Sequence, residues 1–193
     1  MKGRQPSEAR AALLPGELRT ARLILRPWRV TDAALLAPIL AANVDHLTGW
    51  IPARIATPAP VDLLSIRLSE FATAFDAARE WRYAILSADG ELLGEMSLFP
   101  RSDAGRVAFD DADRIELGYW LRQDATGNGY ATEAARAAAD LASTLPGVKR
   151  LTIICDERND ASAAIPRRLG FHLASRAADS SGRVLQIWEL ATT

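Results

Sequence analysis

The feature that most constrains this 193-residue chain is a helix with small inward residues directly after a glycine-containing loop. From Tyr130 to Leu145, apolar residues recur at three- and four-residue steps, and most of the inward positions are alanine. Alanine lets a helix approach its neighbour closely, so this segment predicts a helix packed on a β-sheet. The alternating segment 114–121 predicts the preceding strand, and Gly127 and Gly129 lie between the two.

The rest of the chain predicts strands and helices in mixed order around this unit. Thr31 is expected to cap the first helix, and Pro58 and Pro60 precede the second. An Asp-Gly turn joins two central strands, and a further hairpin ends the chain. The expected strands are 20–27, 81–86, 92–98, 114–121, 150–155, 171–176 and 184–190; the expected helices are 31–43, 64–78, 130–145 and 159–169.

These elements predict an α/β (α+β mixed) fold. A central mixed, mostly antiparallel, twisted sheet of about seven strands would be flanked by about four helices. We expect residues 1–17 to form a flexible N-terminal tail and residues 18–193 a single domain.

The composition excludes several functional classes. The 23 basic and 24 acidic residues nearly cancel, which argues against binding to nucleic acid or to an anionic membrane surface. No apolar run is long enough to span a bilayer or to act as a signal peptide. A single cysteine, Cys155, and two histidines leave no disulfide framework and no metal-ligand cluster. The expected setting is cytoplasmic and metal-free.

The glycine loop between residues 123 and 134 is a candidate phosphate site. Its backbone N–H groups can converge on an anion that also faces the positive end of the following helix. The competing interpretation is a tight turn that merely needs glycine. A nucleotide P-loop would need Gly-Lys-Ser/Thr, which is absent. A dinucleotide loop would need glycine at Thr132, although Asp156 could bind a ribose; against it, the loop follows an antiparallel hairpin.

Three motifs in one order carry a family resemblance: Glu116-Leu-Gly-Tyr-Trp-Leu121, Gly127-Asn-Gly-Tyr-Ala-Thr-Glu-Ala134, and the segment from Asn159 to Phe171. Together they resemble the GNAT superfamily of N-acetyltransferases, in its RimJ/RimL-like branch, which includes ribosomal-protein-alanine acetyltransferases. The opening strand at 23–28 is similar to that branch as well, so the resemblance covers roughly residues 18–191.

The resemblance implies a GNAT-like sheet that opens beside the 114–121 strand to form a cleft for acetyl-CoA. The pantetheine arm would pair with backbone of Tyr119 and Leu121. Asn159 would face the pantetheine, and Arg168 would meet a CoA phosphate; the alternatives are a helix cap and a solvated charge. The pyrophosphate would lie on Thr126, Gly127, Asn128, Gly129, Tyr130 and Ala131.

Two positions depart from the family pattern. The phosphate loop has Thr126 where the family usually has Arg or Gln. Pro166 lies inside the Asn159 helix, which should therefore be kinked or start late. Ile165 and Pro166 also stand where many relatives carry a tyrosine acid.

Acetyl transfer to an amine needs a base, an oxyanion site and a proton for the leaving thiolate. Glu116 is the first candidate base and Glu95 the second; each can instead be a structural strand residue. Backbone N–H groups near Tyr119 could hold the oxyanion if the strand bulges there. Ser162 is the candidate acid, or else a residue that serves the backbone. A covalent route through Cys155 is not expected.

The predicted function is acetyl-CoA-dependent transfer of an acetyl group to a primary amine, namely a protein or peptide N-terminus, by direct attack in a ternary complex. The alternatives are a small-molecule amine (antibiotic, polyamine or amino acid) as acceptor, or a non-catalytic acyl-CoA-binding module. A homodimer is possible. The segment 43–78 and the 177–183 turn should wall the acceptor site, with Trp50 as a lid or a core residue. Asp110, Asp111 and Asp113 could attract a cationic amine or could simply be solvated.

Overall fold

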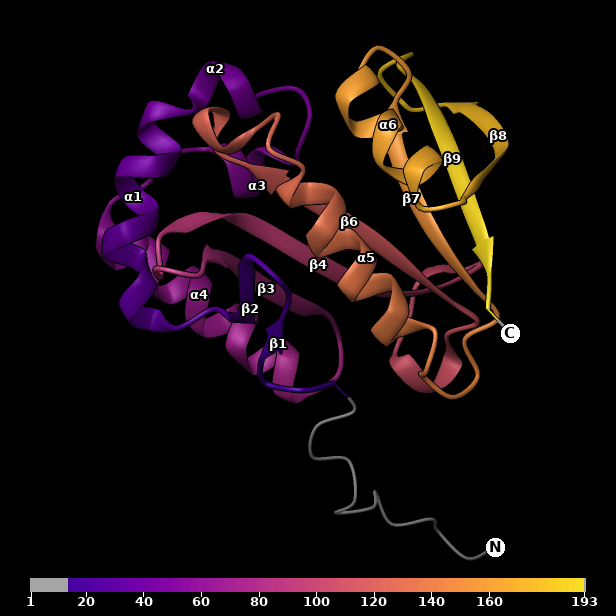
Figure 1. Cartoon of the computed structure of the whole chain (residues 1–193), viewed down its shortest axis with the longest axis horizontal. Coiled ribbons are helices and arrows are strands. Elements are labelled where there is room, and N and C mark those ends of the chain that lie inside the picture. The colour runs from indigo at the N-terminus through magenta and orange to yellow at the C-terminus, as the bar shows by residue number, and fades with distance from the viewer. Residues whose placement is uncertain (1–13, 193) are drawn as a thin grey trace, which may run out of the picture.

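The computed structural model describes residues 14–192 and arranges them around one sheet (Figure 1). The strand order is β1-β2-β3-β4-β6-β7-β9-β8, with β5 paired to β4. Every neighbouring pair is antiparallel except β6 and β7. The strands are β1 (Leu18–Arg19), β2 (Leu23–Pro27), β3 (Trp81–Ser87), β4 (Leu92–Ser102), β5 (Gly105–Arg106), β6 (Arg114–Leu121), β7 (Arg150–Asp156), β8 (His172–Ala178) and β9 (Val184–Ala191).

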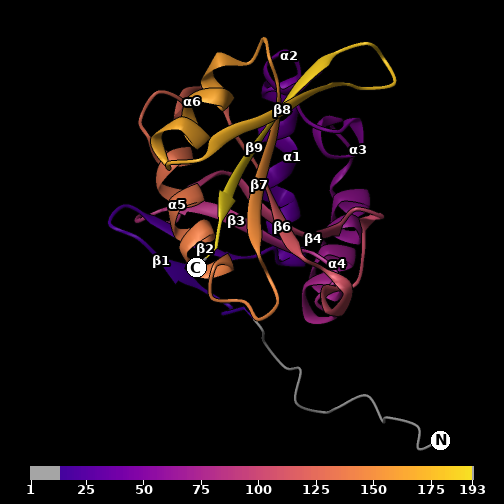
Figure 2. The ribbon, with the colours of Figure 1, turned by 90° about the vertical axis from the view of Figure 1, so that its right-hand side faces the viewer.

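Helices cover both faces of the sheet. Figure 2 shows α5 and α6 on one side and α4 on the other. Within residues 14–192, no helix has the length and apolarity needed to cross a membrane. The helices are α1 (Ala33–Ala42), α2 (Val44–Leu47), α3 (Ala53–Ala56), α4 (Val61–Asp76), α5 (Tyr130–Ala142) and α6 (Asp160–Arg168).

The alanine-rich helix packs closely on the sheet, as its sequence predicts. Ala134, Ala135 and Ala138 have no exposed surface and join one core cluster with Ile115 and Leu117 of β6. A methyl side chain keeps the helix axis near the strands, which brings the helix N-terminus close to the end of β6. The phosphate-loop candidate is therefore positioned by the core.

The opposite face of the sheet carries the second core cluster. Leu64, Leu68 and Phe71 of α4 are buried there against Trp28 and Trp120. These helix positions recur at three- and four-residue steps, so one face of α4 is apolar, as predicted.

The mixed α/β architecture is confirmed, with more short elements than predicted. The strands β1 and β5 have two residues each and the helices α2 and α3 have four, too few to leave a periodic pattern. Thr31 was the predicted helix cap, which is wrong. It lies inside a 3-10 turn, Val30–Asp32, and the Asp32 carboxylate instead accepts the backbone N–H of Arg29 at 2.8 Å.

Ordered structure begins earlier than the predicted boundary at residue 18. Leu14 is buried in the core, and the carbonyl of Pro15 accepts a hydrogen bond from the Tyr83 hydroxyl at 3.0 Å. Leu14 and Pro15 thus contact the core from within the segment predicted as a tail. Its remaining part, residues 1–13, lies outside the described residues.

The parallel pair β6–β7 is where the sheet opens. Pairing runs only from Arg114↔Arg150 to Leu117↔Ile153, after which both strands continue without each other. Figure 1 shows them diverging from that end. The bulge that was considered at Tyr119 is absent, because β6 keeps an uninterrupted register with β4 from Arg114 to Leu121. The opening arises from divergence of β7.

A register shift occurs instead between β3 and β4, after Ile85. Next to it, a Cβ on Gly94 would lie 2.0 Å from the carbonyl oxygen of Trp120. Only glycine fits this close approach, which holds β4 against β6 beside the opening.

Candidate active site

A cavity of about 790 Å³ lies where β6 and β7 diverge. At one end, the cavity is lined by residues 126–132, which form the glycine loop and the first turn of α5. Gly118 and Tyr119 of β6 line its middle, and the charged residues Glu116 and Arg101 line the other end. The predicted cleft is therefore present, and it joins the candidate phosphate loop to the candidate base.

The loop at one end of this cavity has the backbone of an anion site. Gly127 and Gly129 have φ values of 78° and 81°, and Gly129 is the residue immediately before α5. The side-chain amide of Asn128 donates to the carbonyl oxygens of Ala125 (3.3 Å) and Thr126 (3.1 Å). Glycine adopts the left-handed conformation without strain, so the backbone can curl in front of the positive helix end.

A set of side-chain contacts that holds this loop from behind was not predicted from the sequence. Arg22 donates to the carbonyl oxygen of Asn128 at 3.0 Å and to the carboxylate of Glu133 at 2.7 Å, and its guanidinium lies 4.7 Å from the ring centre of Tyr130. Thr20 also donates to Glu133, at 2.6 Å. Hydrogen bonds from Arg22 and Thr20 lower the pKa of Glu133, although burial acts in the opposite direction as the largest single influence.

The edge of β6 that faces the cavity is open beyond Leu117. Arg122 N donates to Leu93 O of β4 at 2.8 Å. Because backbone direction alternates along a strand, the amide and carbonyl groups of Tyr119 and Leu121 point to the other side, where β7 has diverged. His46 Nε2 lies 3.1 Å from the Leu121 carbonyl oxygen. Of the two predicted pantetheine partners, Tyr119 has its edge free of strand pairing and Leu121 already contacts His46.

The N-terminus of α6 borders the cavity across from this edge. Asn159 caps the helix by accepting the backbone N–H of Ser162 at 3.0 Å, and both residues also line the cavity. Pro166 lies inside α6, which nevertheless starts at Asp160. Of the two predicted outcomes, a kink or a late start, the late start does not occur, and Asn159 and Ser162 keep their helix-start geometry. Arg168 lines the cavity at the end of α6 and is exposed.

A tyrosine hydroxyl reaches Ser162 from the sheet, which the sequence did not indicate. The Tyr119 hydroxyl lies 3.2 Å from Ser162 Oγ and donates to the Ser162 carbonyl at 3.1 Å. Burial raises the pKa of Tyr119 far above its ordinary value, so this hydroxyl stays protonated. Burial also raises the pKa of Cys155, which keeps the thiol protonated and disfavours a covalent route.

The candidate base Glu116 lies in the same cavity and is held by Arg101. The guanidinium donates to both carboxylate oxygens, at 2.9 and 3.1 Å. Both side chains are partly exposed, at 19% for Glu116 and 23% for Arg101. Glu116 is thus oriented by a bidentate pair and still accessible from the cavity.

The second candidate, Glu95, is a different kind of carboxylate. It is 3% exposed, and it accepts hydrogen bonds from the Trp28 indole (2.8 Å), Arg82 (2.6 Å) and Ser97 (2.7 Å). Arg82 in turn pairs with Glu80 at 2.7 Å. A carboxylate with both oxygens occupied in a buried network serves the structure better than it serves proton transfer.

The dinucleotide alternative finds no support in this geometry. Both oxygens of Asp156 accept hydrogen bonds from Arg158, at 2.9 and 2.7 Å, and Arg158 lowers the pKa of Asp156 to about 2. The proposed ribose acid is therefore occupied. The loop also follows β6, which is antiparallel to β4.

The predicted walls of the acceptor side meet over the cavity. Arg183, in the β8–β9 turn, donates to the carbonyl oxygen of Gly49 at 2.8 Å. Trp50 is 46% exposed, lines the cavity, and has the Arg158 guanidinium 6.0 Å from its ring centre. Trp50 is thus a covering residue and not part of the core. None of Asp110, Asp111 and Asp113 lines the cavity, so the acidic run is not placed to attract an acceptor.

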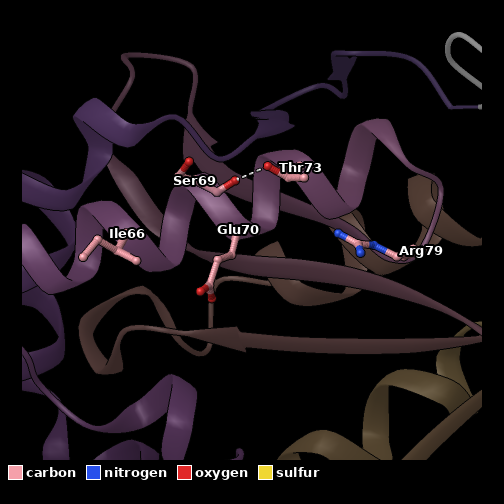
Figure 3. Close-up of a pocket in the computed structure, with 5 residues that line it drawn as sticks. All are labelled: Ile66, Ser69, Glu70, Thr73 and Arg79. Carbon is pink, nitrogen blue, oxygen red and sulfur yellow. Dashed lines mark hydrogen bonds between the residues drawn. The ribbon is translucent and has the colours of Figure 1, made fainter.

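A second hollow, of about 300 Å³, lies along α4 (Figure 3). It is formed by Ile66, Ser69, Glu70, Thr73 and Arg79 and shares no residue with the cleft. Thr73 donates to the Ser69 carbonyl oxygen at 2.9 Å, an ordinary contact within a helix. We therefore place the active site in the larger cavity. No group of three or more metal-ligating side chains gathers anywhere in residues 14–192.

The split sheet, the glycine loop at the α5 N-terminus and the acid–base candidates together define an acyl-transfer enzyme. The model of the acetyltransferase (GNAT) domain matches residues 22–172, and the chain belongs to this family. The chain is accordingly an acetyltransferase, as its motifs predict.

Individual relatives indicate which branch of the GNAT family this chain resembles. The chain is 28% identical over 171 residues to the putative ribosomal N-acetyltransferase YdaF of Bacillus subtilis, covering 81% of each chain. Its fold is similar to that of RimL, a ribosomal L7/L12 alpha-N-protein acetyltransferase solved with coenzyme A (TM-score 0.76, 17% identity, 89% and 95% covered). It is also similar to that of MccE, a microcin C7 self-immunity acetyltransferase solved with acetyl-CoA and AMP (TM-score 0.78, 17% identity, 93% and 98% covered). These relatives agree with the predicted RimJ/RimL-like branch and with the predicted acetyl-CoA co-substrate.

Proposed function

We propose that this chain transfers the acetyl group of acetyl-CoA to the N-terminal amine of a protein or peptide, by direct attack in a ternary complex. The observation that carries the proposal is the single cavity that joins the glycine loop to the Glu116–Arg101 pair. Donor and acceptor can occupy such a cavity together, which is what direct attack requires. YdaF is described as a putative ribosomal N-acetyltransferase and RimL as an alpha-N-protein acetyltransferase, and both descriptions support a protein N-terminus as the acceptor.

The donor end fits coenzyme A through backbone groups. The amides around Gly127 and Gly129, together with the N-terminus of α5, would hold the pyrophosphate, and Arg168 would meet a CoA phosphate. The unpaired edge of Tyr119 would hydrogen-bond the pantetheine. Backbone donors need no long side chain, so Thr126 is compatible with binding. Acetyl-CoA bound in this way would supply an activated acetyl thioester beside β6.

The acceptor end supplies the proton chemistry. Glu116 takes the proton of the attacking amine, directly or through a water. The backbone N–H of Tyr119 faces the opening without any bulge in β6 and stabilises the negative charge that develops on the carbonyl oxygen, while the Tyr119 carbonyl is left to pair with the pantetheine. As the carbon–sulfur bond breaks, the Ser162 hydroxyl, which is hydrogen-bonded to the Tyr119 hydroxyl, donates a proton to the thiolate and takes one back from water in the open cavity. The absence of a tyrosine on α6 is therefore compensated from β6.

Replacing Glu116 by glutamine tests this assignment. We expect Glu116→Gln to lower kcat by about 100-fold or more, because the amide cannot accept the amine proton, while the Kd for acetyl-CoA stays unchanged. Thiol release with N-terminal peptides and small amines measures turnover, and calorimetry measures binding. Glu157→Gln is the matched control, since Glu157 is exposed and does not line the cavity. Full activity in Glu116→Gln would remove Glu116 from the mechanism.

A small-molecule amine is the second candidate acceptor. Its support is the similarity to MccE and the Arg183–Gly49 contact, which encloses one side of the cavity. Turnover of small amines with no turnover of peptides would select it.

A further inference from the structure

The acceptor end of the cavity is rich in arginine. Arg54 of α3, Arg82 of β3, Arg101 of β4 and Arg106 of β5 all line it. They come from four separate elements, so no local sequence pattern indicates that they meet. We call these four residues the arginine face.

Three members of the arginine face gather around one aromatic ring. The guanidinium carbons of Arg106, Arg82 and Arg101 lie 4.4, 4.9 and 5.9 Å from the ring centre of Phe99. Phe99 is the cross-strand partner of Glu116. Side chains of such partners lie about 5 Å apart, so the arginine face adjoins the candidate base.

The carboxylates in contact with the arginine face do not balance its charge. Glu80 pairs with Arg82 and Arg106, Glu95 pairs with Arg82, and Glu116 pairs with Arg101. Arg54 has no ion-pair partner among residues 14–192. Four guanidiniums thus face three carboxylates, and the unpaired one is on an exposed residue at the cavity wall.

A further observation favours an anionic ligand at this wall. The pKa of Arg106 is lowered, first by burial and then by the charges of Arg101, Arg82 and Arg54, although Glu80 acts in the opposite direction. A bound oxyanion would offset the repulsion among these guanidiniums.

We propose that the arginine face is an anion subsite, and that the preferred acceptor is the N-terminus of an acidic peptide. This inference rests on the proposed function. The amine would lie at Glu116 and a carboxylate of one of the first three residues would lie between Arg54 and Arg106, because an extended chain advances about 3.3 Å per residue. The positive surroundings also favour the neutral, nucleophilic form of the amine. Arg82 and Glu95 line the cavity with only 4% and 3% of their surface exposed, so they support the subsite and the more exposed Arg54 and Arg106 would contact the ligand.

The test compares three peptides that share an N-terminal serine and differ only in the next two residues, which are Asp-Glu, Ala-Ala or Lys-Lys. With the full chain and acetyl-CoA, we expect kcat/KM for the acidic peptide to exceed that for the neutral one by about tenfold, with the basic peptide lowest. Added salt should reduce the difference. Equal kcat/KM values for the three peptides would overturn the subsite while leaving the proposed function in place.

Single substitutions test which arginines form the anion subsite. Arg54→Glu should lower kcat/KM for the acidic peptide by about tenfold more than it lowers kcat/KM for the neutral peptide. Arg106→Gln should act in the same direction. Arg79→Glu is the matched control, since it makes the same charge change in the hollow of Figure 3, outside the cleft. An equal loss for both peptides in Arg54→Glu would contradict the inference.

Binding separates this inference from the proposed function. Calorimetric titration of the CoA-loaded protein with the same peptides needs no turnover. Tighter binding of the acidic peptide, weakened by Arg54→Glu, would support the subsite even if no acetyl transfer occurred. Equal or absent binding of all three peptides would overturn it. Turnover of free aspartate or phosphoserine with none of any peptide would keep the anion subsite and reject the peptide acceptor.

Discussion

Single side chains in this site differ by what surrounds them more than by what they are. Glu95 and Glu116 are both strand glutamates on neighbouring strands. Both line the cavity, but Glu95 is 3% exposed and accepts hydrogen bonds from Trp28, Arg82 and Ser97, whereas Glu116 is 19% exposed and has one guanidinium partner. The same side-chain type therefore serves as a structural anchor in one place and as a candidate base in the other.

The Asp32 carboxylate offers a test of such an anchor through pH. It is 4% exposed, pairs with Arg26 at 2.7 and 2.8 Å, and accepts the Arg29 amide. Burial alone would raise its pKa, but these partners hold the pKa below the ordinary value of 3.8. A lowered folded-state pKa stabilises the fold above pH 4, and this stabilisation disappears as the pH falls through the folded pKa.

We therefore expect Asp32→Asn to lower the free energy of unfolding by about 1–3 kcal/mol at pH 7, and by much less at pH 3. Urea unfolding at pH 7, 5 and 3 measures the difference. Asp89→Asn, in the exposed β3–β4 turn, should have little effect at any of these values. A loss for Asp32→Asn that is equal at pH 7 and pH 3 would show that the charge is not the source.

At the scale of elements, the phosphate loop is held by segments far from it in sequence. The start of the loop is fastened by Asn43, after α1, whose side-chain oxygen accepts the Gln123 amide at 2.7 Å. Its end is fastened by Arg22, before β2, through Asn128 and Glu133. The loop is thus fixed on both sides before any ligand binds, which reduces the entropy cost of binding.

Removing the Arg22 contacts, which hold the end of the phosphate loop, should make the loop more mobile. We expect Arg22→Ala to raise the Kd for coenzyme A by about three- to tenfold, a modest effect because the Arg22 side chain is 49% exposed. Calorimetry with coenzyme A measures it. Arg19→Ala removes a similar surface arginine, which pairs with Glu17 instead, and should leave the Kd unchanged. Wild-type affinity in Arg22→Ala would mean that the glycines and Asn128 alone hold the loop.

At the scale of the whole molecule, one sheet carries both sides of the cleft. The two sides are joined by the four-residue pairing of β6 with β7 at one end of the opening. Across the cavity they are joined again by the Arg183–Gly49 hydrogen bond. Widening of the cleft therefore requires the Arg183–Gly49 contact to break, together with the Tyr119–Ser162 contact between β6 and α6, because the β6–β7 pairing is part of the sheet.

Arg183→Ala should make the cover over the cavity more mobile. We expect amide hydrogen exchange of residues 48–52 to accelerate by about tenfold, since the segment loses its partner on the β8–β9 turn. Hydrogen-exchange mass spectrometry measures the change. Arg176→Ala, on exposed β8, is the control and should leave this segment unaffected. Unchanged exchange in Arg183→Ala would show that the segment is held by its own helices.

The sequence by itself determined the parts of this protein that rest on local patterns. The inward alanines of α5, the glycines at 127 and 129, and the alternation of β6 required only neighbouring residues, and they located the loop, the helix and the strand beside the cleft. Which side chains surround Glu116, Glu95 and the loop was decided by tertiary structure alone. Arg22, Arg54 and Arg101 reach the site from separate elements, and their contacts depend on strand order and register, which no short stretch of sequence encodes.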